Sequence, residues 1–461
     1  MTDYSALLQP DQGQPARTIH LLAKPDCDDW IAAQPERVRA LAAAQRFAAK
    51  PGEMLVVPGD AADDWSAVAG AAESPGPWDL AGVAAKLPGG TYRLAEGEPG
   101  LAALGWLLAH YQFDRYKPMP DTVPVRVLLS GAPASIAETV RIAQATALVR
   151  DMVNTPAADM GPEMIEKAVR AVAKEHAATV LVTKGDALET GYPMIHAVGR
   201  AADKIHAPRL IELEWGRADH PRVAIIGKGV SFDSGGLDIK PSSAMRLMKK
   251  DMGGAAHALA LAHLVMQAGL PVRLHLLIPA VENAISGNAF RPGDVLTSRA
   301  GLTVEIDNTD AEGRLVLGDA LTKAGEDGAV LMLDFATLTG AARTALGPDL
   351  PALFANQDDL AHALAQAAQA VQDPVWRLPL WARYDDMLKS DVADIVNSPD
   401  SGMAGAVTAA LFLQRFVKPG TEWAHFDTFA WRPTSLPGRP RGGEALGLRA
   451  SWEMLKTRFG G

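Results

Sequence analysis

Two glycine-punctuated segments of this 461-residue chain concentrate the residue types that could do chemistry. The segment "GKGVSFDSGGLDIKPSSAMRLMKKDMGG" (227–254) carries lysines and aspartates, and "NTDAEGRL" (308–315) carries two acids and an arginine at alternate positions. In an extended strand these alternate residues would share one face, although the same stretch is equally compatible with a loop. The charged residues that we single out are Lys228, Asp233, Asp238, Lys240, Asp251, Asp310, Glu312 and Arg314.

A group of carboxylates with neighbouring lysines favours a site for divalent metal ions. Oxygen ligands suit hard ions such as Mg²⁺ and Mn²⁺, and Zn²⁺ also accepts carboxylates. Acids that converged without cations would repel one another, and their pKa values would rise. Two divalent ions would neutralise them and position a water for hydrolysis. Taken singly, each residue has an ordinary explanation as a surface charge, a turn residue or a helix cap, so only the joint pattern indicates a site.

Several other catalytic sites lack their motifs here. The "GKG" at 227–229 is followed by neither the Ser or Thr of a P-loop nor the third glycine of a dinucleotide fingerprint. No HExxH zinc motif and no G-x-S-x-G nucleophile motif occurs. The single cysteine, Cys27, excludes an intramolecular disulfide and a cysteine-based metal cage, and it fits the reducing cytoplasm in which we expect the protein.

Composition and charge narrow the class of protein further. With 48% hydrophobic and 21% charged residues, the chain is typical of soluble globular proteins. The formal net charge of −10 argues against a nucleic-acid partner, because such proteins normally present a basic surface to phosphates. The N-terminus lacks the pattern of a signal peptide, and no apolar run approaches the roughly 20 residues that span a bilayer. We therefore expect no membrane association.

The alternation of apolar runs and helical patterns predicts two α/β domains. A small N-terminal α/β domain (1–134) is followed by a connecting helix (135–156) that ends at the Thr155–Pro156 step, because the residue before proline resists helical geometry. The larger domain (157–461) should hold a mixed, mostly buried central sheet flanked by helices. Ligands of such sheets bind at the carboxyl ends of the strands. The predicted strands are 18–23, 54–59, 91–95, 123–131, 179–185, 209–215, 222–229, 272–281 and 329–340, and the predicted helices include 35–50, 100–116 and 253–269.

The two charged segments, 227–256 and 308–315, together resemble the leucyl aminopeptidase (cytosol aminopeptidase) family of dinuclear metallo-exopeptidases. "NTDAEGRL" matches the family signature in full, and the spacings agree: Lys228 and Asp233 lie five apart, Lys240 follows seven later and Asp251 eleven after that. The stretches 333–341, 390–413 and 422–431 resemble further family segments. The resemblance thus extends from about residue 150 to the end, and the first domain matches only by position.

The resemblance implies a role for each matching residue. Lys240 would polarise the scissile carbonyl, and Arg314 would hold a bicarbonate ion that acts as general base on a water between the metals. Asp233 and Glu312 would bridge two divalent ions, Mn²⁺ or Zn²⁺. The implied metal ligands are Lys228, Asp233, Asp251, Asp310 and Glu312.

The resemblance also implies the substrate and the assembly. One metal would take the free α-amine of a peptide, so that cleavage occurs only after the first residue, with leucine or a similar residue preferred. Met248, Thr337 and Gly340 match positions that line the pocket for the first side chain, although core packing explains Met248 equally well. The family further implies a homohexamer.

Two other functions stay open on the sequence. One is a non-catalytic binding or regulatory protein on the same scaffold, including one that contacts DNA. The complete ligand set argues against lost catalysis, and the acidic net charge argues against a nucleic-acid role. The other is a dinuclear hydrolase of another amide or ester, since bridged metals could serve either reaction. Two departures from the family are Asp238, which we expect to face solvent, and the loop "VNSPDSGMAGAV" (396–407), which leaves the pocket shape open.

Overall fold

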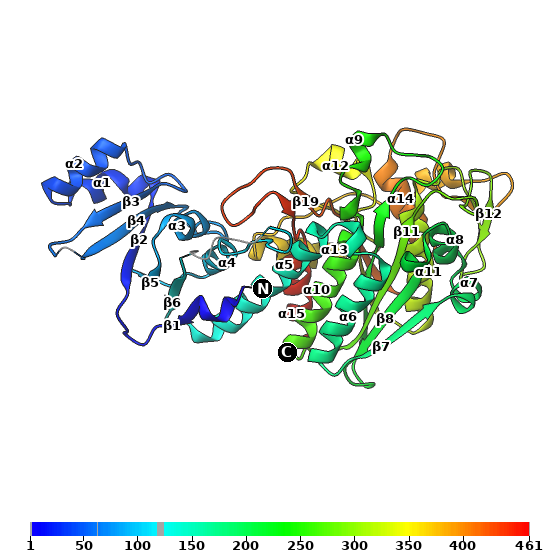
Figure 1. Cartoon of the computed structure of the whole chain (residues 1–461), viewed down its shortest axis with the longest axis horizontal. Coiled ribbons are helices and arrows are strands. Elements are labelled where there is room, and N and C mark those ends of the chain that lie inside the picture. Colours follow the sequence, from blue (N-terminus) through cyan, green and yellow to red (C-terminus); the bar gives the residue numbers. More distant parts are fainter. Residues whose placement is uncertain (1, 62, 118–123, 461) are drawn as a thin grey trace. The chain divides into compact units, whose positions relative to one another are not determined.

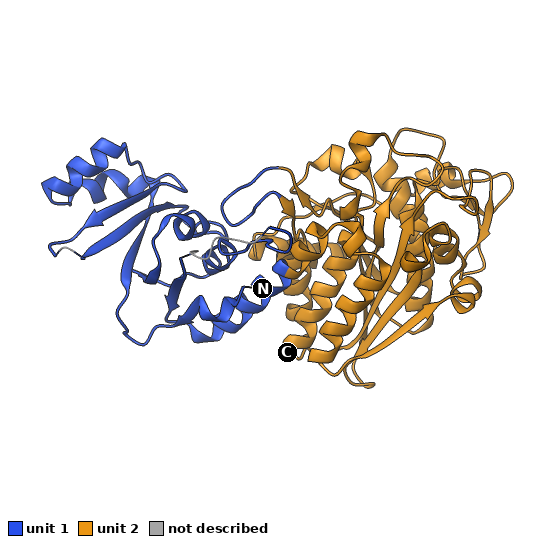
Figure 2. Cartoon of the chain, viewed as in Figure 1, with its two compact units in different colours: residues 1–147, 434–441 blue, residues 148–433, 442–461 orange. Residues whose placement is uncertain are grey.

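The computed structural model describes residues 2–61, 63–117 and 124–460 and divides into two compact units. Unit 1 comprises Met1–Ala147 and Thr434–Arg441, and unit 2 comprises Leu148–Pro433 and Gly442–Gly461 (Figure 2). The division falls within helix α5 (Pro133–Asn154), which ends two residues before Pro156. Each unit has its own sheet and its own hydrophobic core, and the fold is α/β throughout (Figure 1).

Unit 1 is built on a six-stranded sheet in the order β1-β6-β5-β2-β4-β3. Neighbouring strands are parallel except β3 and β4. Residue 123 of the predicted strand 123–131 lies outside the described residues. The strands are β1 (Leu8–Pro10), β2 (Arg17–Ala23), β3 (Met54–Pro58), β4 (Trp65–Ala71), β5 (Gly90–Leu94) and β6 (Arg126–Ser130), and the helices are α1 (Cys27–Ala32), α2 (Glu36–Gln45), α3 (Ala81–Lys86) and α4 (Ala102–Leu108).

Unit 2 is built on a nine-stranded mixed sheet. Its central strands β11, β9, β14 and β18 are parallel neighbours, and antiparallel strands flank them on both sides. The strands of this sheet are β7 (Thr179–Lys184), β8 (Arg209–Trp215), β9 (Arg222–Gly227), β10 (Gly229–Asp233), β11 (Arg273–Asn283), β14 (Leu331–Ala336), β15 (Ala352–Ala355), β16 (Trp376–Arg377) and β18 (Glu422–Asp427). Short strands outside it are β12 (Val295–Thr297), β13 (Thr303–Glu305), β17 (Ile395–Val396), β19 (Trp431–Arg432) and β20 (Gly442–Gly443).

Helices cover both faces of the unit 2 sheet (Figure 1). One layer contains α6 (Pro162–Glu175), α10 (Gly253–Gln267), α13 (Asp358–Ala370) and α15 (Leu448–Phe459). The other contains α7 (Asp186–Gly191), α8 (Pro193–Gly199), α11 (Glu312–Glu326) and α14 (Gly405–Gln414), and two short helices, α9 (Ser242–Met245) and α12 (Gly340–Leu346), lie near the carboxyl ends of the strands. This arrangement confirms the predicted fold class, a small α/β domain and a larger one with a mixed, helix-flanked sheet.

The parallel central strands of the unit 2 sheet place the residues that follow them at the same side of the sheet. Strand β9 is apolar and buried along Val223–Gly227, and helix α10, which is buried from Gly253 to Met266, packs against it. A helix that is apolar on all sides can only be stable inside the protein. Because β9, β14 and β18 are parallel, their carboxyl ends meet at the same edge. In the described part of the chain, no helix has both the length and the apolar character to cross a bilayer.

Candidate functional site

The predicted ligands come from four segments that meet at the carboxyl edge of the unit 2 sheet. Lys228 directly follows β9, Asp233 ends β10, and Asp251 lies in the 3-10 helix η5 (Met248–Met252). Asp310 lies in a turn, and Glu312 is the first residue of α11. The extended alternative for 310–314 is therefore wrong: a turn followed by a helix carries Asp310, Glu312 and Arg314 to the site.

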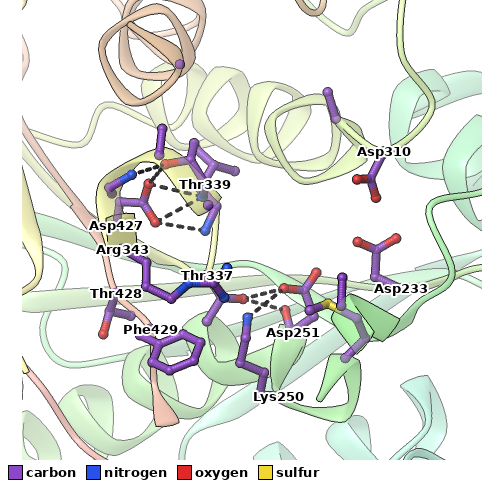
Figure 3. A pocket seen from close by; sticks show the side chains of 18 of the residues that line it. Asp233, Lys250, Asp251, Asp310, Thr337, Thr339, Arg343, Asp427, Thr428 and Phe429 are labelled. Carbon is purple, nitrogen blue, oxygen red and sulfur yellow. Dashed lines mark hydrogen bonds and ion pairs between the residues drawn. The ribbon is translucent and has the colours of Figure 1, made fainter. Parts of the chain in front are cut away.

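Four carboxylates share two lysines in this cluster, which we call the ligand cluster. The Nζ atom of Lys228 lies 2.7 Å from Asp251 Oδ2 and 2.9 Å from Glu312 Oε1. The Nζ atom of Lys240 lies 2.8 Å from Asp233 Oδ2 and also pairs with Asp310 Oδ1. Figure 3 shows the carboxylates of Asp233 and Asp310 pointing toward one another. The five predicted metal ligands and Lys240 are thus brought together.

The ligand cluster fits divalent metal ions. Asp251 Oδ2, Asp310 Oδ1 and Glu312 Oε1 are buried and accept no hydrogen bond from the described residues, although lysine nitrogens lie within ion-pair distance. Buried polar atoms are normally hydrogen-bonded, and these three oxygens have only lysine nitrogens as partners. Ligand atoms from Asp233, Asp310 and Glu312 all lie within 4.8 Å of one another. Such an oxygen-rich set is the donor type that Mn²⁺ uses and Zn²⁺ accepts.

Crowding shifts the pKa values of these acids in opposite directions. Burial, followed by the charge of Asp233, raises the pKa of Glu312 to about 8 and that of Asp310 to about 6. Burial also disfavours the charged form of Asp251, but Lys228 and Lys250 outweigh it and lower the pKa of Asp251 to about 2. The lysines therefore stabilise the charged form of Asp251 more than that of Asp310 or Glu312. A divalent cation would compete with protons for the oxygens of Asp310 and Glu312.

A network of hydrogen bonds fastens the two motif segments together. Asn283 Nδ2 donates to Asp233 Oδ1 (2.9 Å) and to the backbone oxygen of Thr309 (3.1 Å). The Thr309 N–H donates to Asp238 Oδ2 (2.7 Å), and the Thr309 hydroxyl donates to the oxygen of Gly235 (2.7 Å). Asp238 is exposed but does not merely face solvent, because it anchors the loop that precedes Asp310. Sequence reasoning missed Asn283 and Thr309; the only signal for Asn283 was a polar residue at the end of an apolar strand.

Gly235 shows why a glycine is needed in the first motif. Its φ of 87° lies in the left-handed region, and a Cβ atom there would lie 2.4 Å from the oxygen of Asp238. Any other residue would be strained and would also push the loop apart. The tight turn in turn lets the Gly235 N–H donate to Asp233 Oδ1 at 2.9 Å. The glycine thus orients a carboxylate of the ligand cluster.

Arg314 follows Glu312 by two residues in α11, and part of its guanidinium is unpaired. It is buried, its Nη1 donates to the backbone oxygen of Asn397 (2.7 Å), and its Nε has no partner among the described residues. Burial lowers the pKa of Arg314 to about 10, with Glu312 acting in the opposite direction. A guanidinium with a free donor is suited to a planar oxyanion such as bicarbonate.

The ligand cluster opens onto a pocket of about 460 Å³. Met248, Thr337 and Gly340, the three residues predicted to contact substrate, all line it. The Thr337 hydroxyl donates to Asp251 Oδ1 at 2.7 Å, which ties this wall to the ligand cluster. Residues of the lining that sequence reasoning missed are Lys250, Arg343, Asp427, Thr428 and Phe429 (Figure 3).

Asp427, at the end of β18, holds the neighbouring loop in place. Its Oδ1 accepts the N–H of Leu338 (2.9 Å), and its Oδ2 accepts the hydroxyl of Thr339 (2.6 Å). Figure 3 shows these bonds between the end of β18 and the residues that follow β14. Burial raises the pKa of Asp427, although the charge of His425 acts against this. The carboxylate thus fixes the wall that carries Thr337 and Gly340.

Comparisons with known proteins agree with this geometry. The model of the cytosol aminopeptidase family catalytic domain matches residues 147–450, and that of the M17 aminopeptidase N-terminal domain matches residues 18–128. The relative named "Probable cytosol aminopeptidase" from Syntrophotalea carbinolica is 41% identical over 369 residues, which cover 76% of this chain and 73% of the relative.

Two solved structures extend the similarity to the whole chain. The crystal structure of cytosol aminopeptidase from Coxiella burnetii has a TM-score of 0.92 and 46% identity, and the match covers 98% of this chain and 99% of that one. The bottromycin maturation enzyme BotP in complex with Mn has a TM-score of 0.85 and 32% identity, covering 96% and 100%. Because the catalytic-domain model spans most of the sequence and the fold agrees over almost all of it, this chain belongs to the cytosol aminopeptidase family, which supports metallo-aminopeptidase activity.

Proposed function

We propose that this protein removes the first residue from peptides with a free N-terminus, with leucine or a similar residue as the family's expected preference. The observation that carries the proposal is the convergence of four carboxylates on two lysines at the edge of a pocket, with buried oxygens whose only partners are lysine nitrogens and which fit divalent ions. Membership of the cytosol aminopeptidase family supports the same reaction.

Five residues would hold two metal ions, Mn²⁺ or Zn²⁺. When bound, the ions supply Lewis acidity and the means to activate water for hydrolysis. Lys228 is the unusual member of the set, because its amine must be neutral in order to donate an electron pair. The BotP structure in complex with Mn supports manganese as one candidate. The proposed ligands are Lys228, Asp233, Asp251, Asp310 and Glu312.

Lys240 and Arg314 have separate tasks in this proposal. Burial alone would lower the pKa of Lys240, but Asp233 and Glu312 outweigh it and keep the ammonium protonated. A protonated lysine at the rim of the cluster can stabilise negative charge that develops on the scissile carbonyl. Arg314, with its unpaired Nε, would bind bicarbonate and hold it where it accepts a proton from the attacking water.

The assembly and the location are part of the same proposal. The family resemblance supports a homohexamer, and the name of the relatives, cytosol aminopeptidase, supports a cytoplasmic protein. The complete ligand cluster disfavours a non-catalytic, DNA-contacting role on this scaffold. The presence of Lys240 and Arg314 next to the ligands favours a peptidase over a dinuclear hydrolase of another amide or ester.

The test measures release of leucine from leucine amide after loading with Mn²⁺ and again after chelation. N-acetyl-leucine amide serves as the control substrate, because it lacks the free amine. We expect metal-dependent release from the free amine alone, restored when Mn²⁺ is added back. Absence of release from any amino-acid amide, with two metal ions bound per chain, would overturn the proposal and favour another substrate class.

A further inference from the structure

Two cationic side chains without an assigned role line the pocket beside the residues proposed to contact the substrate. Lys250 and Arg343 share the lining with Met248, Thr337 and Gly340. Figure 3 shows Lys250 next to Asp251 and Thr337, with Arg343 and Phe429 on the same side of the pocket. The wall proposed to receive the first side chain is therefore more cationic than a pocket for leucine requires.

Lys250 is buried and shares its carboxylate partner. It is 4% exposed, and its Nζ lies 3.4 Å from Asp251 Oδ1, the oxygen that also accepts the Thr337 hydroxyl. The other oxygen of Asp251 lies 2.7 Å from Lys228. Within the described residues this long contact is the only polar one that Lys250 makes through its side chain. Buried charges are normally paired, so Lys250 retains capacity to bind a further anion.

Arg343 brings a second set of donors to the same wall. It lies in α12, and one of its guanidinium nitrogens, Nη2, is 3.9 Å from the position that a Cβ atom would take at Gly340. No described residue accepts a hydrogen bond from its guanidinium or forms an ion pair with it. An arginine offers a planar pair of donors that matches a carboxylate, and its charge does not depend on its surroundings.

The ring of Phe429 contacts both Lys250 and Arg343. The Lys250 Nζ lies 5.5 Å from the centre of its ring, and the Arg343 guanidinium carbon lies 4.9 Å from it. Contacts of this kind position a cation without neutralising it. The lining also holds four acids: Asp233, Asp251 and Asp310 belong to the ligand cluster, and Asp427 accepts hydrogen bonds from Leu338 and Thr339.

We propose that this pocket selects peptides whose first residue is acidic, glutamate or aspartate, with the side-chain carboxylate held between Lys250 and Arg343. The inference rests on the proposed exopeptidase function and replaces its leucine preference with a definite class. A leucine side chain would leave the buried Lys250 with only its long contact to Asp251, whereas a carboxylate would accept from Lys250 and from the exposed guanidinium of Arg343. Met248 and the ring of Phe429 would contact the methylene groups of the same side chain.

The experiment compares glutamate amide with glutamine amide, which has nearly the same shape and no charge. For the Mn²⁺-loaded full chain we expect a kcat/KM for glutamate amide at least about tenfold above that for glutamine amide, the range of one hydrogen bond to a charged group. Lys250→Met and Arg343→Met should each reduce this ratio, mainly through KM. The double variant should bring it close to one, and Arg343→Glu should shift the preference toward lysine amide.

Lys249→Met is the matched control, because it makes the same substitution one residue earlier. The Lys249 side chain donates to the backbone oxygen of Asn154 and is not part of the pocket lining. We expect the glutamate-to-glutamine ratio of this variant to equal that of the wild type. Metal content per chain is measured for every variant, so that a lost metal is not mistaken for a lost subsite.

Leucine amide separates failure of this inference from failure of the proposed function. Cleavage of leucine amide with a glutamate-to-glutamine ratio of one or less overturns the inference and leaves the exopeptidase function intact. A glutamate-to-glutamine ratio that stays high in the double variant also overturns the inference, because residues other than Lys250 and Arg343 would then bind the substrate carboxylate. For a variant that loses turnover, binding of free glutamate and glutamine by calorimetry gives the same comparison, and equal affinities in the wild type would contradict the proposal.

Discussion

Two buried groups of acids lie at opposite ends of the unit 2 sheet, and their charges are balanced differently. In the ligand cluster, four carboxylates share Lys228 and Lys240, and Lys250 is a third cation, 3.4 Å from Asp251. The other group, which we call the opposite-end cluster, consists of Glu212, Arg222, His275, Lys323 and Asp327. Its His275 pairs with Ala224 near the start of β9, whereas Lys228 follows the end of that strand.

Each acid of the opposite-end cluster has at least one basic side chain beside it. The His275 Nε2 lies 2.9 Å from Glu212 Oε2, and the Lys323 Nζ lies 2.6 Å from Asp327 Oδ2. Arg222 lies 4.0 Å from the same oxygen of Asp327. Glu212, His275 and Asp327 are also close enough to hold a metal ion. Proximity of ligand types therefore does not identify the site. The ratio of acids to protein cations does, because an excess of acid calls for an added cation.

We expect the largest effect on activity from a substitution in the ligand cluster, and no such effect from one in the opposite-end cluster. Glu312→Ala removes a proposed bridging carboxylate, and we expect turnover to fall by more than about 100-fold, the upper range for residues that merely orient a ligand. Metal content measured on the purified protein should fall with it. Glu212→Ala is the matched change in the opposite-end cluster, and we expect it to leave the metal content unchanged. Full activity of Glu312→Ala with its metals in place would contradict the assignment of metal binding to the ligand cluster alone.

The opposite-end cluster should instead affect stability. His275→Ala leaves Glu212 buried without its nearest hydrogen-bond partner, and leaving a buried polar group unsatisfied costs about 1–3 kcal/mol. We expect the free energy of unfolding, measured by denaturant titration with metal held constant, to fall by this order. The metal content of the folded variant should match the wild type. A variant with unchanged stability and reduced metal content would show that this cluster also holds an ion.

We expect the smallest effect from a change in the pocket wall that Asp427 holds in place. Asp427→Asn keeps the shape of the side chain but weakens acceptance from Leu338 and Thr339, so the wall that carries Thr337 should shift slightly. We expect a roughly tenfold loss of kcat/KM, because small displacements at a reacting centre are costly. Steady-state kinetics and metal analysis together check this. A loss of metal rather than of substrate affinity would assign Asp427 to the ligand cluster.

The fold class and the convergence of the motif residues could be predicted from the sequence, because buried parallel strands are apolar and their loops carry the charged residues. Strand β4 could not, since "WSAVAGA" is rich in alanine and glycine and has low strand propensity. Its Gly70 is explained only by the folded chain: a Cβ atom there would lie 2.1 Å from the oxygen of Lys50. Tertiary packing, which no local pattern contains, decides such a strand.

The residues of the pocket wall could not be predicted from the sequence for a related reason. Lys250 stands among other lysines in "MRLMKKDMGG", and Arg343 lies in a short helix with no motif of its own. Their proximity depends on the pairing of β9 with β14, which brings η5 and α12 to the same edge. Phe429 arrives from a third strand end, after β18. Spacing along the chain indicates candidate ligands within one motif, but it does not show which residues from different motifs line the same wall of the pocket.

The order of the central strands has a consequence for biosynthesis. The pocket draws on the ends of β9, β14 and β18, which are neighbours in space but are translated about 100 residues apart. A ribosome-bound chain that has completed β9 and both charged motifs still lacks β18, and with it Asp427 and Phe429. The wall around the ligand cluster therefore closes only late in translation. A half-made chain cannot present the finished pocket to the free N-termini of other newly made peptides.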